Sequence, residues 1–466
     1  MSFQEQACIA ELYKPEADSG TEYLRDANDD IFWLLYGSVL VFNMQAGFAL
    51  LEAGQVRIKN RSNMLLKNVV DVCMGGVVWY LFGYAFAFGL SSNGFIGGSW
   101  DVLSGCADYS KWMFQWTFAT TSATIVSGAV AERCSFSAYL FMTFLMQGFL
   151  YPVVVHWVWS GYGWLGKDII GGNGLMDFAG SGVVHLTGGT CALVGAVVVG
   201  PRAGRFSPDS LWPMRGNSVA FATLGTMTLW FSWYGFNCVS TGSYSAMYEA
   251  SRVAMATTMS ACGGGLAGLV LNLAHTGAPD ILQALNGILG GLVAVTAGAP
   301  YYEPYVALAG GIVAGAIVFY CSWLLEALKI DDPVNASPVH MACGIWGLLE
   351  VGLLASPAYV DDPKHFGALY GGGAKQLGIQ VLGAVAITLW ATIVSGSVLS
   401  ALKAAKILRV SFEDEIAGLD KLLSNGELVE DTTQQFQPQQ YRYEHTSPTD
   451  GSRGREETDR CGDREN

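Results

Sequence analysis

Two histidines occur in stretches of sequence that echo each other, and imidazole side chains are suited to proton chemistry. In both stretches an aspartate stands eight residues before the histidine, a valine one residue before it and a glycine four residues after it. The stretches run from Asp177 through His185 to Gly189 and from Asp332 through His340 to Gly344. Histidine titrates near neutral pH, so such a pair can hold one proton between its rings. Ionisable groups inside apolar segments are usually functional, and two at equivalent places favour a functional pair over core packing.

The polar residues in these stretches have alternative roles. Metal binding is disfavoured, because two histidines alone make an incomplete ligand set. Asp332 is followed by Pro333, a helix-start signal, and is predicted to cap a helix. Asp177 also precedes a helix, where capping and electrostatic attraction of a cation are both open to it. The remaining histidines are interpreted as structural: His156, His275, His365 and His445.

The composition places the two stretches in a membrane. Of 466 residues, 51% are apolar, only 14% are charged and 58 are glycine, which suits closely packed transmembrane helices. A helix needs about 20 apolar residues to cross the hydrocarbon core. We therefore predict an all-α integral membrane protein with eleven transmembrane helices. The predicted spans are 31–52, 69–90, 112–131, 136–158, 180–200, 217–240, 253–274, 280–299, 305–327, 335–355 and 377–402.

The two histidines fall in the fifth and tenth of these spans. Because they lie five spans apart, an odd number, their stretches must cross the membrane in opposite directions. This is the pattern of an inverted five-plus-five repeat, here followed by one final helix. Binding sites in such proteins lie near the membrane midplane, between the repeats.

The charges predict an orientation and domain limits. Loop Lys and Arg number twelve on one side and seven on the other, which puts the N-terminus outside the cell membrane and the C-terminus in the cytosol. We expect a polar extracellular segment (1–30), a transmembrane domain (31–402), a cytosolic regulatory segment (403–430) and a disordered acidic C-terminus (431–466). Cys8 and Cys106 both fall on the outer side, so the predicted topology allows a disulfide between them. The net charge of −14 argues against nucleic acid as a partner.

Longer motifs in the chain resemble those of the Amt/Mep/Rh ammonium transporter family, in its plant-like Amt branch. The most specific segment runs from Asp177 to Gly189 and continues at Gly200-Pro201-Arg202. The other matching segments lie at 46–54, 59–71, 130–133, 235–237 and 331–347. The resemblance covers roughly residues 30–430. It implies eleven spans, ammonium as the substrate, a lipid membrane as the surroundings and a homotrimer with one pore in each subunit, without a cofactor.

The resemblance also implies roles for individual residues. It makes Trp159, Phe118 and Ser240 an outer substrate-binding site, Phe118 and Phe236 the gate, and His185, His340 and Thr296 the pore lining. Aromatic faces attract ammonium by cation–π interaction, worth about 0.5–2 kcal/mol. A serine oxygen accepts a hydrogen bond from ammonium that potassium cannot donate. Leu422 departs from the family pattern, because plant-type members carry a phosphorylated threonine there.

These inferences predict a transporter or channel that recruits ammonium and conducts ammonia, with or without the proton, past two histidines. The alternatives are an ammonium sensor and a neutral ammonia gas channel. A sensor would usually append a signalling domain, for which residues 430–466 are too short and are expected to be disordered. An enzyme is not expected, because the sequence has no nucleophile elbow, phosphate-binding loop or zinc signature.

Overall fold

The computed structural model of the chain describes residues 20–100, 108–166, 170, 173–207, 214–362 and 365–423. Four sequence predictions lie wholly or largely outside the described residues. They are the polar segment 1–30, the disulfide between Cys8 and Cys106, the structural interpretation of His445 and the disordered C-terminus at 431–466.

Regular structure in the described residues is helical, apart from one isolated bridge between Cys134 and Arg409. The α-helices are α2 (Gly20–Phe42), α3 (Met44–Gln55), α4 (Arg61–Val78), α5 (Tyr84–Phe88), α6 (Tyr109–Ala129), α7 (Phe136–Leu145), α8 (Tyr151–Trp159), α10 (Thr187–Val199), α11 (Val219–Cys238), α12 (Met247–Thr276), α13 (Ile281–Val295), α14 (Pro304–Ala327), α15 (Cys343–Leu354), α16 (Lys375–Ala404) and α17 (Phe412–Ala417). Four π-helical turns are η2 (Trp79–Gly83), η3 (Met146–Leu150), η4 (Ser181–Leu186) and η8 (Ser337–Ala342). The predicted all-α class is confirmed.

Each of the eleven predicted spans overlaps a helix or a run of consecutive helices. Among the described residues, eight helical runs are long and apolar enough to cross a membrane. They are Ala27–Gln55, Ile58–Phe88, Phe136–Trp159, Ser181–Val199, Tyr244–Thr276, Pro304–Ala327, Ser337–Leu354 and Lys375–Ala404. The chain therefore has the helices of a multi-pass membrane protein, whereas the count of eleven crossings stays a prediction.

Three predicted spans, those at α6, α11 and α13, are not among these eight. The 15 residues of α13 reach only about 22 Å, less than the roughly 30 Å of the hydrocarbon core. In α6 the hydropathy is lowered by buried threonines and serines. Thr121 and Thr124 satisfy their hydroxyls by donating to main-chain carbonyls one turn earlier, at 2.9 and 3.0 Å. Such residues suit a buried helix although they weaken its apolar signal.

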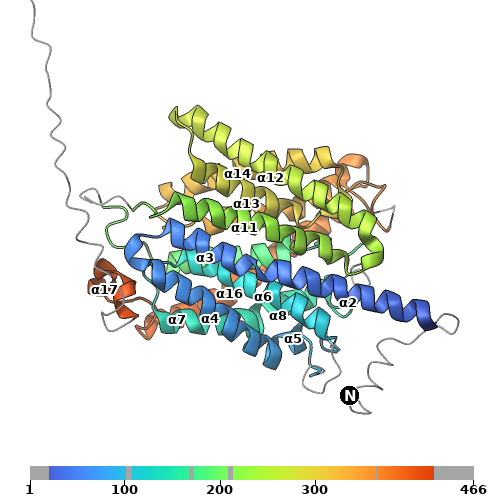
Figure 1. Ribbon diagram of the computed structural model, residues 1–466, viewed down its shortest axis with the longest axis horizontal. Helices are drawn as coiled ribbons and strands as arrows, with labels where there is room; N and C mark the ends of the chain where they lie inside the picture. Colours follow the sequence, from blue (N-terminus) through green and yellow to red (C-terminus); the bar gives the residue numbers. More distant parts are fainter. Residues whose placement is uncertain are drawn as a thin grey trace, which may run out of the picture.

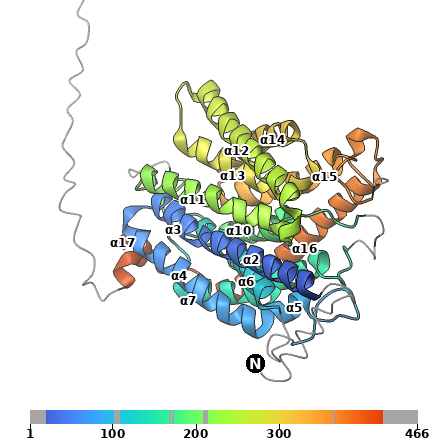
Figure 2. The same ribbon diagram turned by 45° about the vertical axis from the view of Figure 1, so that its right-hand side comes forward.

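The long helices run lengthwise through the molecule (Figures 1 and 2). Helices α12, α13 and α14 pack on one another in one half, and α11 joins them to α2 and α3. In the other half α4 packs against α6 and α7. The short helix α17 lies at the opposite end of the long axis from the start of α2. We refer to these ends as the α17 end and the α2 end.

The two segments of the sequence repeat adopt the same local structure. Each begins with a π-helical turn, η4 or η8, that leads into an α-helix, α10 or α15. The two π-helical turns contact each other inside the bundle. π-helical turns are rare and are frequently found at functional sites, so their occurrence at equivalent places in both segments draws attention to this contact.

Candidate functional site

His185 and His340 lie side by side in the interior of the bundle, one on each π-helical turn. Their Nδ1 atoms are 3.2 Å apart, and the rings are inclined by only 20°, with centroids 5.2 Å apart. At this distance one Nδ1 carries a hydrogen and donates it to the other. Both side chains are buried, with 0% and 4% of their surface exposed. The structure thus brings together the two residues that the sequence repeat singles out.

Each histidine follows an aspartate that caps the start of its helix. The Asp177 carboxylate accepts hydrogen bonds of 3.0 and 2.7 Å from two backbone N–H groups of η4. The Asp332 carboxylate accepts bonds of 3.0 and 2.7 Å from two backbone N–H groups at the start of η8. Both carboxylates therefore occupy capping positions. Oδ1 of Asp177 has no hydrogen-bond partner among the described residues, so attraction of a cation stays open to it.

The glycines of the repeat allow the two segments to approach each other closely. Gly344 lies against η4, where an added Cβ would stand 2.6 Å from the Ser181 carbonyl oxygen and 2.9 Å from the Leu186 backbone nitrogen. Gly189 lies against η8 in the corresponding way. Only glycine fits such backbone contacts, because any other residue would place a methyl carbon inside the neighbouring chain.

A column of aromatic rings leads to His185. The rings of Phe118 and Phe236 are stacked, with centroids 4.0 Å apart and planes inclined by 17°. Phe236 lies 5.5 Å from the His185 ring, and Phe118 meets Trp159 edge to face at 5.9 Å. The three aromatic residues implied by the resemblance therefore form one continuous series from Trp159 to the histidine pair.

Trp159 lines a pocket of about 200 Å³ at the end of this column away from the histidine pair, together with Asp177, Tyr301 and Asp361. Its indole N–H donates to the Asp177 carbonyl oxygen at 2.8 Å, which fixes the plane of the ring. Gly180 has φ of +107°, and an added Cβ would stand 3.1 Å from the Trp159 ring. Glycine is required there by both its backbone angle and the approach of the indole.

Ser240 and Thr296 have hydroxyls that are already engaged with the protein. The Ser240 hydroxyl donates to the Phe236 carbonyl oxygen at 2.7 Å, so its lone pairs remain available to a donor. The Thr296 hydroxyl donates to the Leu292 carbonyl at 2.7 Å and accepts the Trp233 indole N–H at 2.9 Å. Thr296 is therefore linked to the site through Trp233.

Sequence reasoning missed Trp233. Its ring stacks on His185, with centroids 5.1 Å apart and planes inclined by 17°. It stands three residues before Phe236 on α11, so it lies one helical turn away on the same face. That spacing is a signal by which it could have been found, although aromatic residues are common throughout the chain.

A small chamber of about 10 Å³ lies on the other side of His340. Apart from His340 and Glu52, the residues that line it are apolar. Sequence reasoning also missed Glu52, although this residue lies within the matching segment 46–54. Phe48 belongs to the same lining and meets the His340 ring at 6.1 Å. The histidine pair thus separates the aromatic column from a chamber that contains a carboxyl group.

The segment after α16 folds back onto the loops at the α17 end. Asp420 accepts hydrogen bonds of 3.1 and 2.8 Å from two backbone N–H groups in the first turn of α4. Glu415 pairs with Arg409 at 2.8 Å and accepts the Ala203 backbone N–H at 2.6 Å. Lys59 donates to two main-chain carbonyl oxygens of α17. The acidic tail is therefore docked on the helical domain of its own chain by several contacts.

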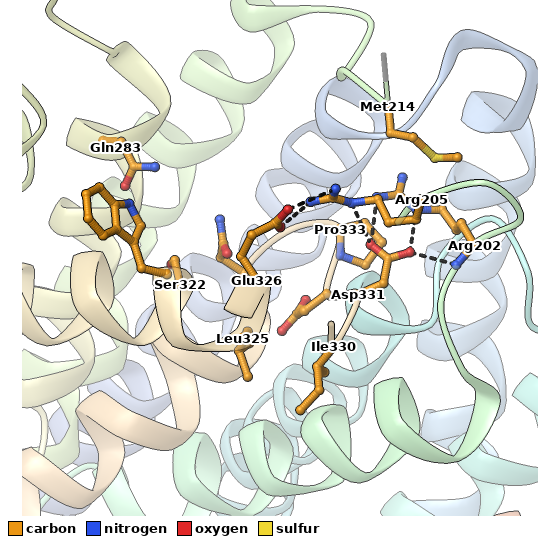
Figure 3. Close-up of a pocket in the computed structure, with 13 residues that line it drawn as sticks. Arg202, Arg205, Met214, Gln283, Ser322, Leu325, Glu326, Ile330, Asp331 and Pro333 are labelled. Carbon is orange, nitrogen blue, oxygen red and sulfur yellow. Dashed lines mark hydrogen bonds and ion pairs between the residues drawn. The ribbon is translucent and has the colours of Figure 1, made fainter. Parts of the chain in front are cut away.

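A polar pocket of about 270 Å³ lies between α14 and the loop after α10 (Figure 3). Arg202 pairs with Asp331 at 2.8 Å, and Arg205 lies between Glu326 and Asp331 in the same cluster. The adjacent guanidinium groups lower the pKa of Asp331 to about 2, although burial opposes this effect. The carboxylates in turn raise the pKa of Arg202 against the opposing effect of burial. This cluster fixes the loop that leads into η8.

Within the described residues there is no group of three or more His, Cys, Asp or Glu side chains that could hold a metal ion. His156, interpreted as structural, is buried, and its Nδ1 lies 2.9 Å from the Ala87 carbonyl oxygen. The histidine pair therefore stays the centre of the candidate site.

Comparison with known proteins assigns the family. Residues 32–425 match the family model described as Ammonium Transporter Family. Ammonium transporter 1 member 1 of Arabidopsis thaliana is 42% identical over 403 residues, covering 81% of this chain and 80% of the relative. Ammonium transporter 1 member 3 of Solanum lycopersicum is 39% identical over 445 residues, covering 90% and 96%.

Solved structures agree with this assignment. A structure named "Sensor Amt Protein" has a TM-score of 0.79 and 34% identity, covering 86% of this chain and 99% of that one. Saccharomyces cerevisiae Mep2 has a TM-score of 0.73 and 27% identity, covering 83% and 90%. The family and these relatives are named as transporters, not as enzymes. With a matching family model over most of its length, the chain is a multi-pass membrane protein that belongs to the ammonium transporter family.

Proposed function

We propose that this protein moves ammonium across the cell membrane by recruiting the ion at an aromatic site and conducting ammonia past His185 and His340. The observation that carries the proposal is the buried contact between the two imidazoles at the end of the aromatic column. A proton-accepting pair in an apolar interior suits a substrate that can lose its proton.

Recruitment is assigned to the pocket beside Trp159. The indole and the Phe118 ring offer π faces, and each cation–π contact is worth about 0.5–2 kcal/mol, depending on desolvation. Ser240 is not among the residues that line this pocket, but it is hydrogen-bonded to Phe236 of the aromatic column. Its lone pairs can accept an N–H hydrogen, which favours ammonium over potassium. The free oxygen of Asp177 adds a negative charge or dipole at the same pocket.

Passage is assigned to the column below this pocket. The rings of Phe118 and Phe236 are in stacked contact, and in this proposal the gate opens by their displacement. An ion in an apolar passage of this kind is unfavourable by several kcal/mol, whereas a neutral ammonia molecule is not. Loss of the proton to the histidine pair therefore lowers the barrier. Trp233 and Thr296 hold the His185 ring in position.

In this proposal the α2 end faces the outside and the α17 end the cytosol, as the positive-inside rule predicts. The protein assembles as a homotrimer in the plasma membrane, with one pore in each subunit, as the resemblance implies. The docked tail then lies in the cytosol, where it is available for regulation.

The test is voltage clamp of cells that express the chain, combined with uptake of ¹⁵N-ammonium in the same cells. Uptake with an inward current supports transport of both ammonia and a proton. Uptake without current supports the neutral gas channel. Correct surface expression with neither uptake nor current contradicts the proposal and favours the sensor alternative.

A further inference from the structure

We propose that Glu52 is a further proton-transfer group of this pathway, which holds a proton in the chamber behind His340 and returns it to ammonia. The inference rests on the proposed transport function and extends it to the α17 side of the histidine pair. Glu52 lies at the α17 end of α3, and its side chain is buried, with 2% of its surface exposed.

The chamber brings Glu52 and His340 together in otherwise apolar surroundings. Its other lining residues are Phe48, Leu51, Ile125, Leu289, Val334, Ala336 and Val339. At about 10 Å³ it has room for about one water-sized molecule, which is also the size of ammonia. A molecule that passes the histidines in this direction therefore meets one other titratable group, Glu52.

The contacts of Glu52 leave its charge without a paired cation. Its carboxylate accepts hydrogen bonds from the Ser127 hydroxyl and from the Asn68 amide, the latter at 2.7 Å. Both partners are neutral. The nearest charged groups are on α4: Lys67 directs its ammonium group to the Cys134 carbonyl at 3.3 Å, and Asp71 is a second acid. A buried carboxylate without a cation is unfavourable, so Glu52 needs either a proton or a cation from the chamber.

The surrounding chain makes space for this carboxyl group at the chamber wall. An added Cβ at Gly128 would stand 3.2 Å from Glu52 Oε1 and 2.3 Å from the Val334 side chain. Gly128 thus permits α6, Glu52 and the chamber wall to meet. Ser127, the neighbouring residue, supplies the hydroxyl that orients the carboxylate.

The proposed step balances in protons and charge. Ammonium loses a proton to the histidine pair, and the ammonia remains on the far side of the pair. An N–H bond of the protonated pair then breaks as its proton passes to the Glu52 carboxylate through one water molecule in the chamber, and the ammonia takes the place of this water. The Glu52 O–H bond then breaks, the proton forms the fourth N–H bond of ammonium, and the carboxylate is left ionised. The ammonium leaves toward the α17 end, and the neutral histidine pair and the ionised carboxylate are again in their starting state. One proton therefore accompanies each ammonia.

The experiment compares the parent protein with Glu52→Gln. It measures the ammonium current under voltage clamp and the uptake of ¹⁵N-ammonium in the same cells, both normalised to surface abundance. The ratio of the two is the charge moved per nitrogen atom. Loss of a positioned proton-transfer group lowers rates by about 100-fold or more. We therefore expect the ammonium current of Glu52→Gln to collapse and its charge-to-nitrogen ratio to fall at least about tenfold, while neutral uptake persists. Glu52→Asp, which keeps a carboxyl group, should have a charge-to-nitrogen ratio close to that of the parent.

The matched control is Glu350→Gln. Glu350 is also buried, with 1% exposed, and stands on α15 ten residues after His340, but it does not line the chamber. Its neutralisation should leave the ratio unchanged. If Glu52→Gln fails to reach the surface, Glu52→Met serves as a second neutral variant, because apolar replacement of a buried charge is often neutral or stabilising.

Each outcome decides the inference. An unchanged charge-to-nitrogen ratio in the neutral Glu52 variants overturns it. A parent that takes up ammonium without current also overturns it, while leaving transport itself intact. A parent that takes up no ammonium refutes the proposed function instead.

Discussion

Gly189 of one repeat lies directly against the backbone that carries His340 in the other. An added Cβ at Gly189 would stand 2.2 Å from the Met341 backbone nitrogen and 2.7 Å from the His340 carbonyl carbon. Both partners are backbone atoms, so neither can move aside without displacing η8. The spacing of the two imidazoles therefore depends on a residue whose only contribution is the absence of a side chain.

This relationship predicts that Gly189→Ala disturbs the histidine pair. Overpacking in a well-packed interior costs about 1–3 kcal/mol, and here it would also shift a π-helical turn. We expect lower thermal stability in detergent and lower ammonium uptake per surface molecule.

The control is Gly378→Ala on α16, where an added Cβ meets nothing within 4 Å. Gly378 lies in the first turn of α16, so that change should be neutral or stabilising by less than about 1 kcal/mol. Equal behaviour of the two variants would show that the close approach does not hold the pair.

Local spacing made part of this arrangement predictable. The shared offsets of aspartate, histidine and glycine identified the two segments, since equivalent residues in an inverted repeat meet at its centre. The π-helical form of η4 and η8 could not be read from the sequence, because the spacing of the residues in both segments is equally compatible with an ordinary α-helical turn.

Contacts between helices that are distant in the chain could not be predicted from the sequence either. Glu52 reaches its chamber only where α3, α6 and η8 converge, and a single carboxylate in an apolar run carries no sign of that. Trp233 stacks on His185 from α11. Without tertiary structure it is one of many aromatic residues, most of which pack in a core.

The outer pocket gives a prediction for affinity. Trp159→Leu removes a π face and should weaken apparent ammonium affinity by roughly 2- to 30-fold, which corresponds to about 0.5–2 kcal/mol. The measurement is the concentration dependence of the ammonium current.

Trp390→Leu is the matched control for Trp159. Both indoles are half-buried and donate to a main-chain carbonyl, at 3.0 Å for Trp390 and 2.8 Å for Trp159. Trp390 packs against Trp157 and two phenylalanines away from the pocket. An equal loss of affinity in both variants would count against recruitment at Trp159.

The docked tail predicts a difference between two truncations. Ending the chain after Leu402 removes Arg409, Glu415 and Asp420 together, and with them the cap on α4. Each exposed ion pair is worth under about 1 kcal/mol, but the contacts act jointly. We expect uptake per surface molecule to fall severalfold, whereas truncation after Thr433 should have little effect. The same activity in both chains would mean that docking does not affect transport.

The ion-pair cluster in Figure 3 predicts a dependence of stability on pH. The folded protein lowers the pKa of Asp331 from its ordinary 3.8 to about 2. The ionised carboxylate therefore stabilises the fold above about pH 4, and this contribution is lost as the pH falls toward 2. Since one pKa unit corresponds to about 1.4 kcal/mol, the contribution is on the order of 2 kcal/mol.

Asp331→Asn should accordingly lower the unfolding midpoint in detergent at pH 7, with a difference from the parent that narrows below about pH 4. Glu326→Gln is the control, because Glu326 is 55% exposed and its pair with Arg205 is worth less than about 1 kcal/mol. A difference for Asp331→Asn that is constant with pH would contradict the role of its charge.

The most direct test of the central claim is ammonium uptake and potassium selectivity in His185→Ala and His340→Ala. The account predicts that each variant loses about 100-fold or more in uptake, as expected for removal of a proton-transfer group, or admits potassium as water fills the space. The matched control is His156→Ala, because that histidine is buried outside the column. Uptake rate and selectivity equal to the parent in both His185→Ala and His340→Ala, at equal surface abundance, would contradict conduction past the histidine pair.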